Sequence, residues 1–177
     1  MTTESQQKVL RYRWVIFWIL ACGYVLVYFH RLCPAVVAVD MMRDLKTGGA
    51  LTGFLGAAYF YPYALMQLPA GLLSDSWGPR RSISLFFTVA FIGSVMLGLA
   101  PSVLLALVGR TLVGLGVAML FVPTMKILAE WFRAKEFATM TAILIVMGGL
   151  GSLTAASPLA ILSTWIGWRL SFVAVGV

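Results

Sequence analysis

Three basic side chains lie inside long apolar stretches of the sequence: Arg31, Arg110 and Lys126. If these stretches span a lipid bilayer, each charge costs at least about 2.5–3.5 kcal/mol at the centre of a helix. Charged residues in such positions usually face the interior of a helical bundle or a water-filled cavity, and they mark binding sites. The chemistry of the chain is therefore expected at these three positions.

Arg31 has the local environment expected of a residue that binds an anion. On a helix, Tyr28 and Tyr24 share the face of Arg31, because they precede it by about one and two turns. A guanidinium beside phenol groups suits a carboxylate or a phosphate, and Pro34 weakens the helix just after it. The alternative is that Arg31 bonds only to carbonyl groups at a helix end or to a carboxylate elsewhere in the protein.

His30 and Lys126 each allow two interpretations. His30 can titrate near neutral pH and couple proton movement to anion binding, or it can face a neighbouring helix as an ordinary polar residue. Lys126 shortly precedes Trp131, so its long side chain can reach the inner membrane interface or point into a cavity as a second cation.

Arg110 is too far from Lys126 to bind the same group of a ligand. On one helix the two residues are about 24 Å apart along the axis and about 160° apart around it. Arg110 is expected to hold helices together or to act in a gate in the outer half of the membrane.

A polar stripe of Tyr59, Tyr63 and Gln67 recurs at steps of four on another apolar stretch. It is either the wall of a cavity or a set of hydrogen bonds between helices, worth about 0.6 kcal/mol per pair. The sequence contains no Ser-His-Asp arrangement, no metal-ligand spacing and no glycine-rich phosphate loop with a lysine. It therefore predicts no enzyme activity, no metal and no cofactor.

The composition is that of an integral membrane protein. Of the 177 residues, 61% are hydrophobic and 11% are charged, with a mean hydropathy of +0.96, whereas soluble domains are about 45–50% apolar and about 25% charged. These values exclude a soluble enzyme, a disordered chain and a secreted disulfide scaffold. The net charge of +7 is scattered among apolar runs and forms no patch, which argues against nucleic acid as a partner.

Six apolar stretches can form helices in lipid, where backbone polar groups must be paired internally. They lie at about 14–39, 51–73, 83–100, 103–128, 137–162 and 166–177. Pro101-Ser102 and Ser163-Thr164 are expected as tight links between neighbouring helices. The fold class is thus an all-α integral membrane bundle.

Two domains follow from these stretches: a cytoplasmic tail at 1–13 and a transmembrane bundle at 14–177. The residues from Gly167 to the end of the chain form only about 16 Å of helix, whereas the hydrocarbon core of a bilayer is about 30 Å thick. The bundle is therefore expected to hold five complete helices and the start of a sixth, with the chain truncated within that sixth helix.

Most of the remaining basic residues fall in three segments on one side of the predicted bundle. They are Lys8, Arg11, Arg13, Arg80, Arg81, Arg133 and Lys135. By the positive-inside rule this side faces the cytoplasm, so the N-terminus is expected to be cytoplasmic.

The segment between the second and third stretches resembles the signature loop of the major facilitator superfamily. It reads Gly71-Leu-Leu-Ser-Asp75-Ser-Trp-Gly78-Pro-Arg80-Arg81. The resemblance implies a tight turn at Gly78 and an inner gate in which Asp75 and the arginines form a charge latch. Glu130 is the expected partner of Arg80 or Arg81. The segment Arg110-Thr-Leu-Val-Gly114-Leu-Gly116 is similar to the signature of the fourth helix of the family.

Within the superfamily, the chain resembles the anion:cation symporter and organophosphate branches. The likeness rests on Arg31 in the first helix, on Tyr63, Gln67 and Pro69 in the second, and on Lys126 a few residues before Trp131-Phe132. It implies a twelve-helix fold in two halves with the site between them, of which this chain supplies the N-terminal half. The implied substrate-binding residues are Arg31, Lys126, Tyr63, Tyr24 and Gln67, with His30 as a candidate for proton coupling.

Two hypotheses about function follow. The first is alternating-access transport of a small organic anion (a carboxylate, a sugar acid or a phosphorylated compound) across the inner membrane. Its partners would be a co-transported cation (H+ or Na+), the lipid bilayer and the missing C-terminal half of the transporter. The alternative is a truncated, non-transporting membrane protein that only packs against other helices.

Overall fold

The structure is a computed structural model that describes residues 3–176, with side chains described for residues 11–174. Over the described residues the chain forms helices and turns and contains no strand, which confirms an all-α fold. The helices are α1 (Thr3–Val36), α2 (Ala38–Asp44), α3 (Ala50–Ser76), α4 (Pro79–Gly98), α5 (Val103–Ala118), α6 (Phe121–Trp131) and α7 (Ala134–Gly176).

Within the part of the chain that the structure describes, four segments are long and apolar enough to cross a membrane. They are Arg11–Val36, Pro79–Gly98, Val103–Trp131 and Ala134–Ala174. α3 is not one of them, although its 27 residues extend about 40 Å, because its tyrosines, prolines and Gln67 lower its hydropathy. The number of five complete spanning helices therefore stays a prediction.

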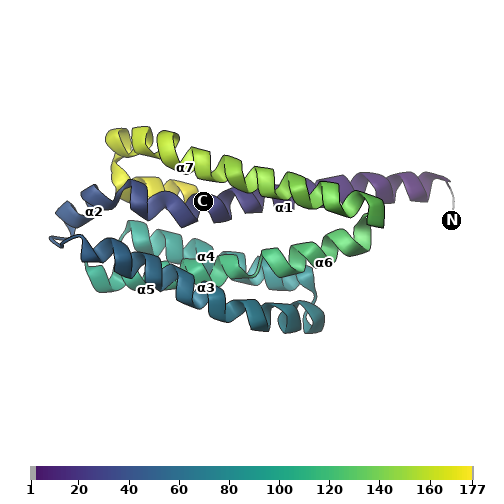
Figure 1. The fold of residues 1–177 in the computed structure, drawn as a ribbon, viewed down its shortest axis with the longest axis horizontal. Helices are drawn as coiled ribbons and strands as arrows, with labels where there is room; N and C mark the ends of the chain where they lie inside the picture. The colour runs from purple at the N-terminus through teal and green to yellow at the C-terminus, as the bar shows by residue number, and fades with distance from the viewer. Residues whose placement is uncertain (1–2, 177) are drawn as a thin grey trace.

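The long helices form an elongated antiparallel bundle (Figure 1). α7 packs along α1, and α5 packs against both α3 and α4. One end, which we call the tail end, holds the start of α1, the α3–α4 turn and the α6–α7 turn. The opposite end, which we call the α2 end, holds α2 and the α4–α5 turn. The three segments with the predicted cytoplasmic charges thus lie at the same end of the bundle.

The predicted link at Ser163-Thr164 is wrong. α7 continues through both residues, and their hydroxyl groups donate hydrogen bonds to the carbonyls of Ala160 (2.8 Å) and Ile161 (2.7 Å) on the same helix. The chain turns instead at Gly167, where φ is 79° and ψ is 158°. Glycine adopts this backbone conformation without the steric penalty of a Cβ atom.

The predicted link at Pro101-Ser102 is confirmed. Ser102 is the N-cap of α5, and its Oγ accepts a hydrogen bond of 3.4 Å from the backbone N–H of Leu105. Such a cap satisfies one of the free N–H groups at a helix start. The predicted stretch at 103–128 consists of two helices, α5 and α6, which meet in a short turn at Met119-Leu120.

The interior consists of two apolar clusters that follow one another along the bundle. On α1 the first cluster reaches Val27 and the second begins at Phe29. On α5 the second cluster includes Ala106 and the first begins at Val113. Arg110 therefore lies at the level where the two clusters meet. Large apolar side chains such as Leu68 (85% exposed) cover the outside, which suits lipid or further helices rather than water.

Candidate functional site

Arg31 lies on α1 among aromatic rings from two helices. Its guanidinium carbon is 5.1 Å from the centre of the Tyr28 ring, 5.4 Å from that of Phe60 and 5.4 Å from that of Tyr63. None of the ion pairs between the described side chains includes Arg31, and its buried Nε has no hydrogen-bond partner among them. The guanidinium therefore keeps its hydrogen-bonding capacity for an anion.

Two of the rings beside Arg31, those of Tyr28 and Tyr63, line a small pocket with an aromatic wall, and Arg31 itself lies next to this pocket. The pocket is lined by Tyr24, Val27, Tyr28, Tyr63, Val117, Leu120 and Phe121. Tyr24 stacks on Tyr28 with ring centres 6.1 Å apart, and Tyr59 stacks on Tyr63 at 5.9 Å. The hydroxyl groups of Tyr24 and Tyr59 are buried without a hydrogen-bond partner among the described residues. Two predicted substrate ligands, Tyr24 and Tyr63, thus meet next to Arg31.

Two phenylalanines at this site, one from α3 and one from α6, were not predicted. Phe60 contacts Arg31 from α3, and Phe121 contacts Tyr24 from α6 with ring centres 6.4 Å apart. The sequence alone does not distinguish a phenylalanine of a binding site from any other phenylalanine in an apolar helix. Only the packing of the helices brings these two residues to the site.

Gln67 lies on α3, one turn after Tyr63 and half-buried. Its Nε2 is buried and has no hydrogen-bond partner among the described side chains. It is not among the residues that line the pocket, so the structure places it beside the aromatic site rather than within it.

Lys126 is paired with a carboxylate instead of lying beside Arg31. Its Nζ donates a hydrogen bond of 2.6 Å to Oδ1 of Asp75, which joins α6 to the end of α3. The Asp75 side chain is 70% exposed and that of Lys126 is 34% exposed. Lys126, which was predicted to bind substrate, is thus in contact with Asp75, which was predicted to form the gate.

The other gate residues lie at the tail end of the bundle. Gly78 has a φ of 83° and precedes α4, which confirms the predicted tight turn. Arg80, Arg81 and Glu130 are exposed, and no ion pair between them occurs among the described side chains. Gly71 is half-buried, and a Cβ atom on it would meet no atom within 4 Å.

Arg110 is almost fully buried, with 1% exposure, and holds α1 and α5 together. Its Nη1 donates to the carbonyl of His30 at 2.7 Å, and its Nη2 donates to the carbonyl of Arg31 at 3.5 Å. Its guanidinium carbon lies 4.5 Å from the centre of the Tyr59 ring. These contacts support the predicted role in holding helices together.

The two glycines after Arg110 allow close helix packing. A Cβ atom on Gly114 would collide with the backbone of Tyr59 on α3, and one on Gly116 would collide with the backbone of α4 at Phe86 and Ala90. Small residues at such positions let helices approach in a membrane.

The imidazole of His30 is buried, with 5% exposure. Its Nδ1 has no hydrogen-bond partner among the described residues, while its backbone carbonyl accepts from Arg110. This ring nitrogen is thus unpaired within the described part of the chain, and His30 directly precedes Arg31, the candidate anion ligand.

Two polar contacts outside this site were not predicted. At the tail end, Arg13 pairs with Glu136 at 3.2 Å and lies 5.1 Å from the ring centre of Phe132. At the α2 end, Asp44 accepts a hydrogen bond of 2.9 Å from Nε1 of Trp168. Both contacts join helices far apart in the sequence, which is why spacing alone could not reveal them.

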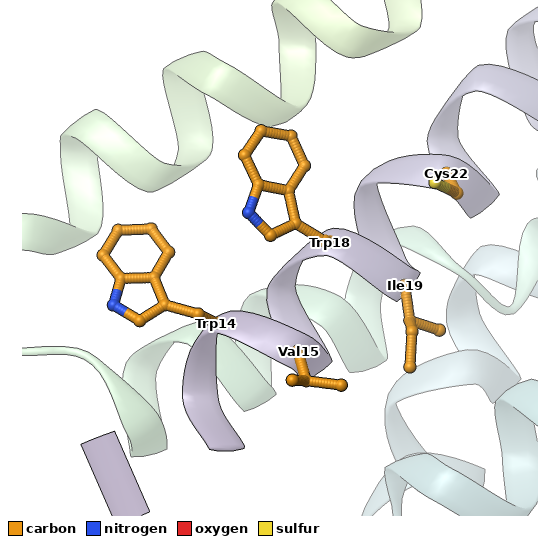
Figure 2. A pocket seen from close by; sticks show the side chains of 5 residues that line it. All are labelled: Trp14, Val15, Trp18, Ile19 and Cys22. Atoms are coloured by element: carbon orange, nitrogen blue, oxygen red, sulfur yellow. The ribbon is translucent and has the colours of Figure 1, made fainter. Parts of the chain in front are cut away.

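A second depression, on the outer face of α1, is entirely apolar. Its lining residues are Trp14, Val15, Trp18, Ile19 and Cys22, and Figure 2 shows that all of them come from this one helix. None of these side chains carries a positive charge to pair with an anion, so this depression is not the candidate site.

The sequence matches a known family over most of its length. The family model described as Major Facilitator Superfamily matches residues 20–177, which include every candidate site residue.

Several curated relatives are similar to nearly the whole chain. A probable galactarate/D-glucarate transporter of Escherichia coli is 28% identical over 186 residues, covering 99% of this chain and 41% of that protein. The hexuronate transporter of Escherichia coli is 26% identical over 170 residues, covering 96% and 39%. A probable sulfoacetate transporter of Cupriavidus necator is 24% identical over 167 residues, covering 94% and 39%. The chain spans about two fifths of the length of these relatives.

The fold matches a solved transporter structure. A bacterial homologue of the human lysosomal transporter Spinster, in an inward-facing and unoccupied conformation, is similar with a TM-score of 0.83 and 27% sequence identity. The match covers 94% of this chain and 40% of that one.

Proposed function

Because the chain belongs to the major facilitator superfamily, we propose that it forms the N-terminal half of a secondary transporter for a small organic anion. The observation that carries the proposal is the guanidinium of Arg31, which lies among aromatic rings and has no carboxylate partner among the described side chains. A charge in that position is costly unless a ligand of opposite charge uses it.

The names of the relatives support an anion as the substrate. They include transporters of galactarate or D-glucarate, of hexuronate and of sulfoacetate. All of these compounds carry a carboxylate or a sulfonate, and the planar fork of an arginine binds a carboxylate through two parallel hydrogen bonds. A sugar acid is the substrate class that we favour, since the phenol groups of Tyr24 and Tyr63 can meet its hydroxyl groups.

The roles of the site residues differ. Arg31 binds the anionic group, Tyr24 and Tyr63 line the pocket, and Gln67 extends the polar surface along α3. Lys126 assists only after it leaves Asp75. The opposite wall of the site would come from the C-terminal half, which corresponds to the remaining three fifths of the relatives' length.

A co-transported cation, H+ or Na+, would offset the charge of the substrate. Moving one negative charge inward against the membrane potential costs about 2.3 kcal/mol per 100 mV, and each symported cation removes this cost for one charge. His30 is the proposed proton site, because its buried ring lies next to Arg31 and its Nδ1 is unpaired among the described residues. The alternative is that His30 is only a buried polar residue.

The bundle would lie in the plasma (inner) membrane, with its tail end facing the cytoplasm. The signature loop there, with Gly71, Asp75 and Gly78, would close the inner mouth together with the charged residues Arg80, Arg81, Lys126 and Glu130. The inward-facing conformation of the similar solved structure supports alternating access between two such mouths.

Binding and uptake by a full transporter that contains this chain test the proposal. We expect Arg31→Ala to weaken D-glucarate binding by about 10- to 100-fold, the value of about one hydrogen bond to a charged group. Arg43→Ala is the matched control, because it removes an exposed arginine paired with Asp40 at the α2 end. Equal D-glucarate affinity of the Arg31→Ala and wild-type proteins would contradict the proposal.

The second candidate function is a non-transporting protein that packs against other helices. The exposed apolar side chains of α3 and α7 suit contact with further helices or with lipid. Reconstitution of the 177-residue chain alone distinguishes the two hypotheses. We expect it to show no alternating-access uptake, because half of the cavity is missing, and robust uptake would refute a two-half mechanism.

A further inference from the structure

Pro34 leaves a carbonyl group on α1 without its usual partner. In an α-helix the N–H of each residue bonds to the carbonyl four positions earlier, and proline has no N–H. The carbonyl of His30 therefore loses its intrahelical hydrogen bond. At this buried level of the bundle an unpaired carbonyl is costly.

Arg110 supplies the missing donor. Its Nη1 lies 2.7 Å from the carbonyl oxygen of His30, and its Nη2 lies 3.5 Å from the carbonyl oxygen of Arg31. One guanidinium thus contacts two successive carbonyls at the place where Pro34 interrupts the helix. The second of them belongs to the residue proposed to bind the anion, so Arg110 holds the backbone from which the Arg31 side chain extends.

A second series of contacts connects the same two arginines through the side chains of α3. The guanidinium of Arg110 lies 4.5 Å from the centre of the Tyr59 ring, Tyr59 stacks on Tyr63 at an interplanar angle of 10°, and Tyr63 lies 5.4 Å from the guanidinium carbon of Arg31. Gly114 permits this arrangement, because any side chain there would collide with the backbone of Tyr59. Arg110 therefore supports both the backbone and one aromatic wall of the site.

We propose that Arg110 is a positioning residue for the anion site: it keeps the Arg31 guanidinium against the rings of Tyr28 and Tyr63 beside the pocket, without itself touching the substrate. This inference rests on the function proposed above. The 1% exposure of Arg110 separates it from any solute in the pocket, and its Nη1 and Nη2 both donate to backbone carbonyls. The carbonyl dipoles and the Tyr59 ring offset the cost of burying its charge.

The proposal predicts a specific dependence between Arg110 and Pro34. In Pro34→Ala, the N–H of the new residue can bond to the His30 carbonyl, so the helix no longer needs the guanidinium. We expect Arg110→Gln to weaken D-glucarate binding about tenfold, which corresponds to about 1.4 kcal/mol. We expect Arg110→Gln combined with Pro34→Ala to recover most of that loss, and Arg110→Lys to be intermediate because lysine has no planar fork.

The measurements are the dissociation constant for D-glucarate and the midpoint of thermal unfolding, both on the full transporter that contains this chain. Pro158→Ala is the matched control, because Pro158 also lies inside a helix, is exposed on α7 and belongs to no contact of Arg110 among the described residues. It should not rescue Arg110→Gln. A residue that only stabilises the fold would change the unfolding midpoint and leave the dissociation constant unchanged.

Each outcome decides a separate question. If Arg31→Ala binds D-glucarate as the wild type does, the proposed function fails and this inference fails with it. If Arg31→Ala loses binding but Arg110→Gln does not, or if the two changes at positions 34 and 110 are simply additive, the positioning role alone is overturned. Should Arg110→Gln not fold, the double variant and Arg110→Lys still carry the test.

Discussion

Lys126 and Asp75 form an ion pair with 2.6 Å between Nζ and Oδ1, which ties α6 to the end of α3 at the tail end of the bundle. Lys126, which was predicted to bind the substrate, is thus paired with Asp75, a carboxylate of the signature loop. If Lys126 assists anion binding, the anion and Asp75 compete for the same ammonium group. This competition would link occupancy of the site to the closure of the inner mouth.

We expect Asp75→Asn to tighten anion binding and to slow transport. The amide cannot hold Lys126 as strongly as the carboxylate, which frees the ammonium for the substrate but weakens the gate. Because both side chains are partly exposed to solvent, the thermal stability should change little. Parallel measurements of D-glucarate affinity, uptake rate and unfolding midpoint check this expectation.

Lys126→Gln is the companion variant for that pair. It should slow transport without tightening D-glucarate binding, since it removes the cation itself. Tighter binding in both variants would show that Asp75 acts on the site by another route.

The ring of Tyr63 matters more than its hydroxyl group for holding Arg31. Tyr63→Phe keeps the stack on Tyr59 and the contact with the guanidinium, whereas Tyr63→Ala removes both. A cation–π contact is worth about 0.5–2 kcal/mol, so we expect Tyr63→Ala to weaken D-glucarate binding by about 3- to 30-fold. Titration calorimetry on the two variants separates the roles, and equal losses would assign the effect to the hydroxyl.

The proposed proton site predicts a dependence on the pH gradient. With His30 as the coupling group, uptake into vesicles should increase when the outside is acidified. His30→Gln should abolish this response while leaving D-glucarate binding in place, because glutamine cannot carry a proton. Measuring uptake with imposed H+ and Na+ gradients tests the idea. A wild-type protein that responds only to Na+ would remove His30 from the coupling mechanism.

Gly114 and Gly71 should respond differently to the same substitution. Gly114→Ala places a methyl group against the backbone of Tyr59, and overpacking of this kind costs about 1–3 kcal/mol. Gly71→Ala, the matched control, meets no atom within 4 Å. We therefore expect a lower unfolding midpoint for Gly114→Ala alone, and equal midpoints would contradict the close approach of α3 and α5.

Much of the arrangement along each helix was predictable, because it depends only on helical periodicity. Tyr28 was expected on the face of Arg31 and lies against its guanidinium. The turn at Gly78 was expected from its place in the signature loop and is present. Neighbours on one helix follow from spacing, so no tertiary information was needed for them.

Contacts between helices were not predictable, because periodicity leaves the rotation and offset of one helix against another undetermined. The rotation of α3 decides whether Phe60 lies next to Arg31. The rotation of α6 decides whether Lys126 points into a cavity or pairs with Asp75. The turn at Gly167 was misplaced to Ser163-Thr164, since hydroxyl residues often mark links but here bond back to their own helix. The hydrogen-bond partner of Arg110 could also be found only from the structure. The position of Pro34 shows that a carbonyl loses its N–H donor, but it does not show which side chain replaces that donor.

The polar residues of α3 have a consequence for how the protein is made. Its three tyrosines, two prolines and Gln67 favour entry into lipid less than leucine or valine would at the same positions. α4 follows after a short turn, it does qualify as a span, and its Ser82 hydroxyl donates a hydrogen bond of 3.1 Å to the carbonyl of Leu73 on α3. We therefore expect α3 and α4 to be inserted together as a hairpin. The polar residues that equip α3 for substrate binding would then make its biogenesis depend on its neighbour.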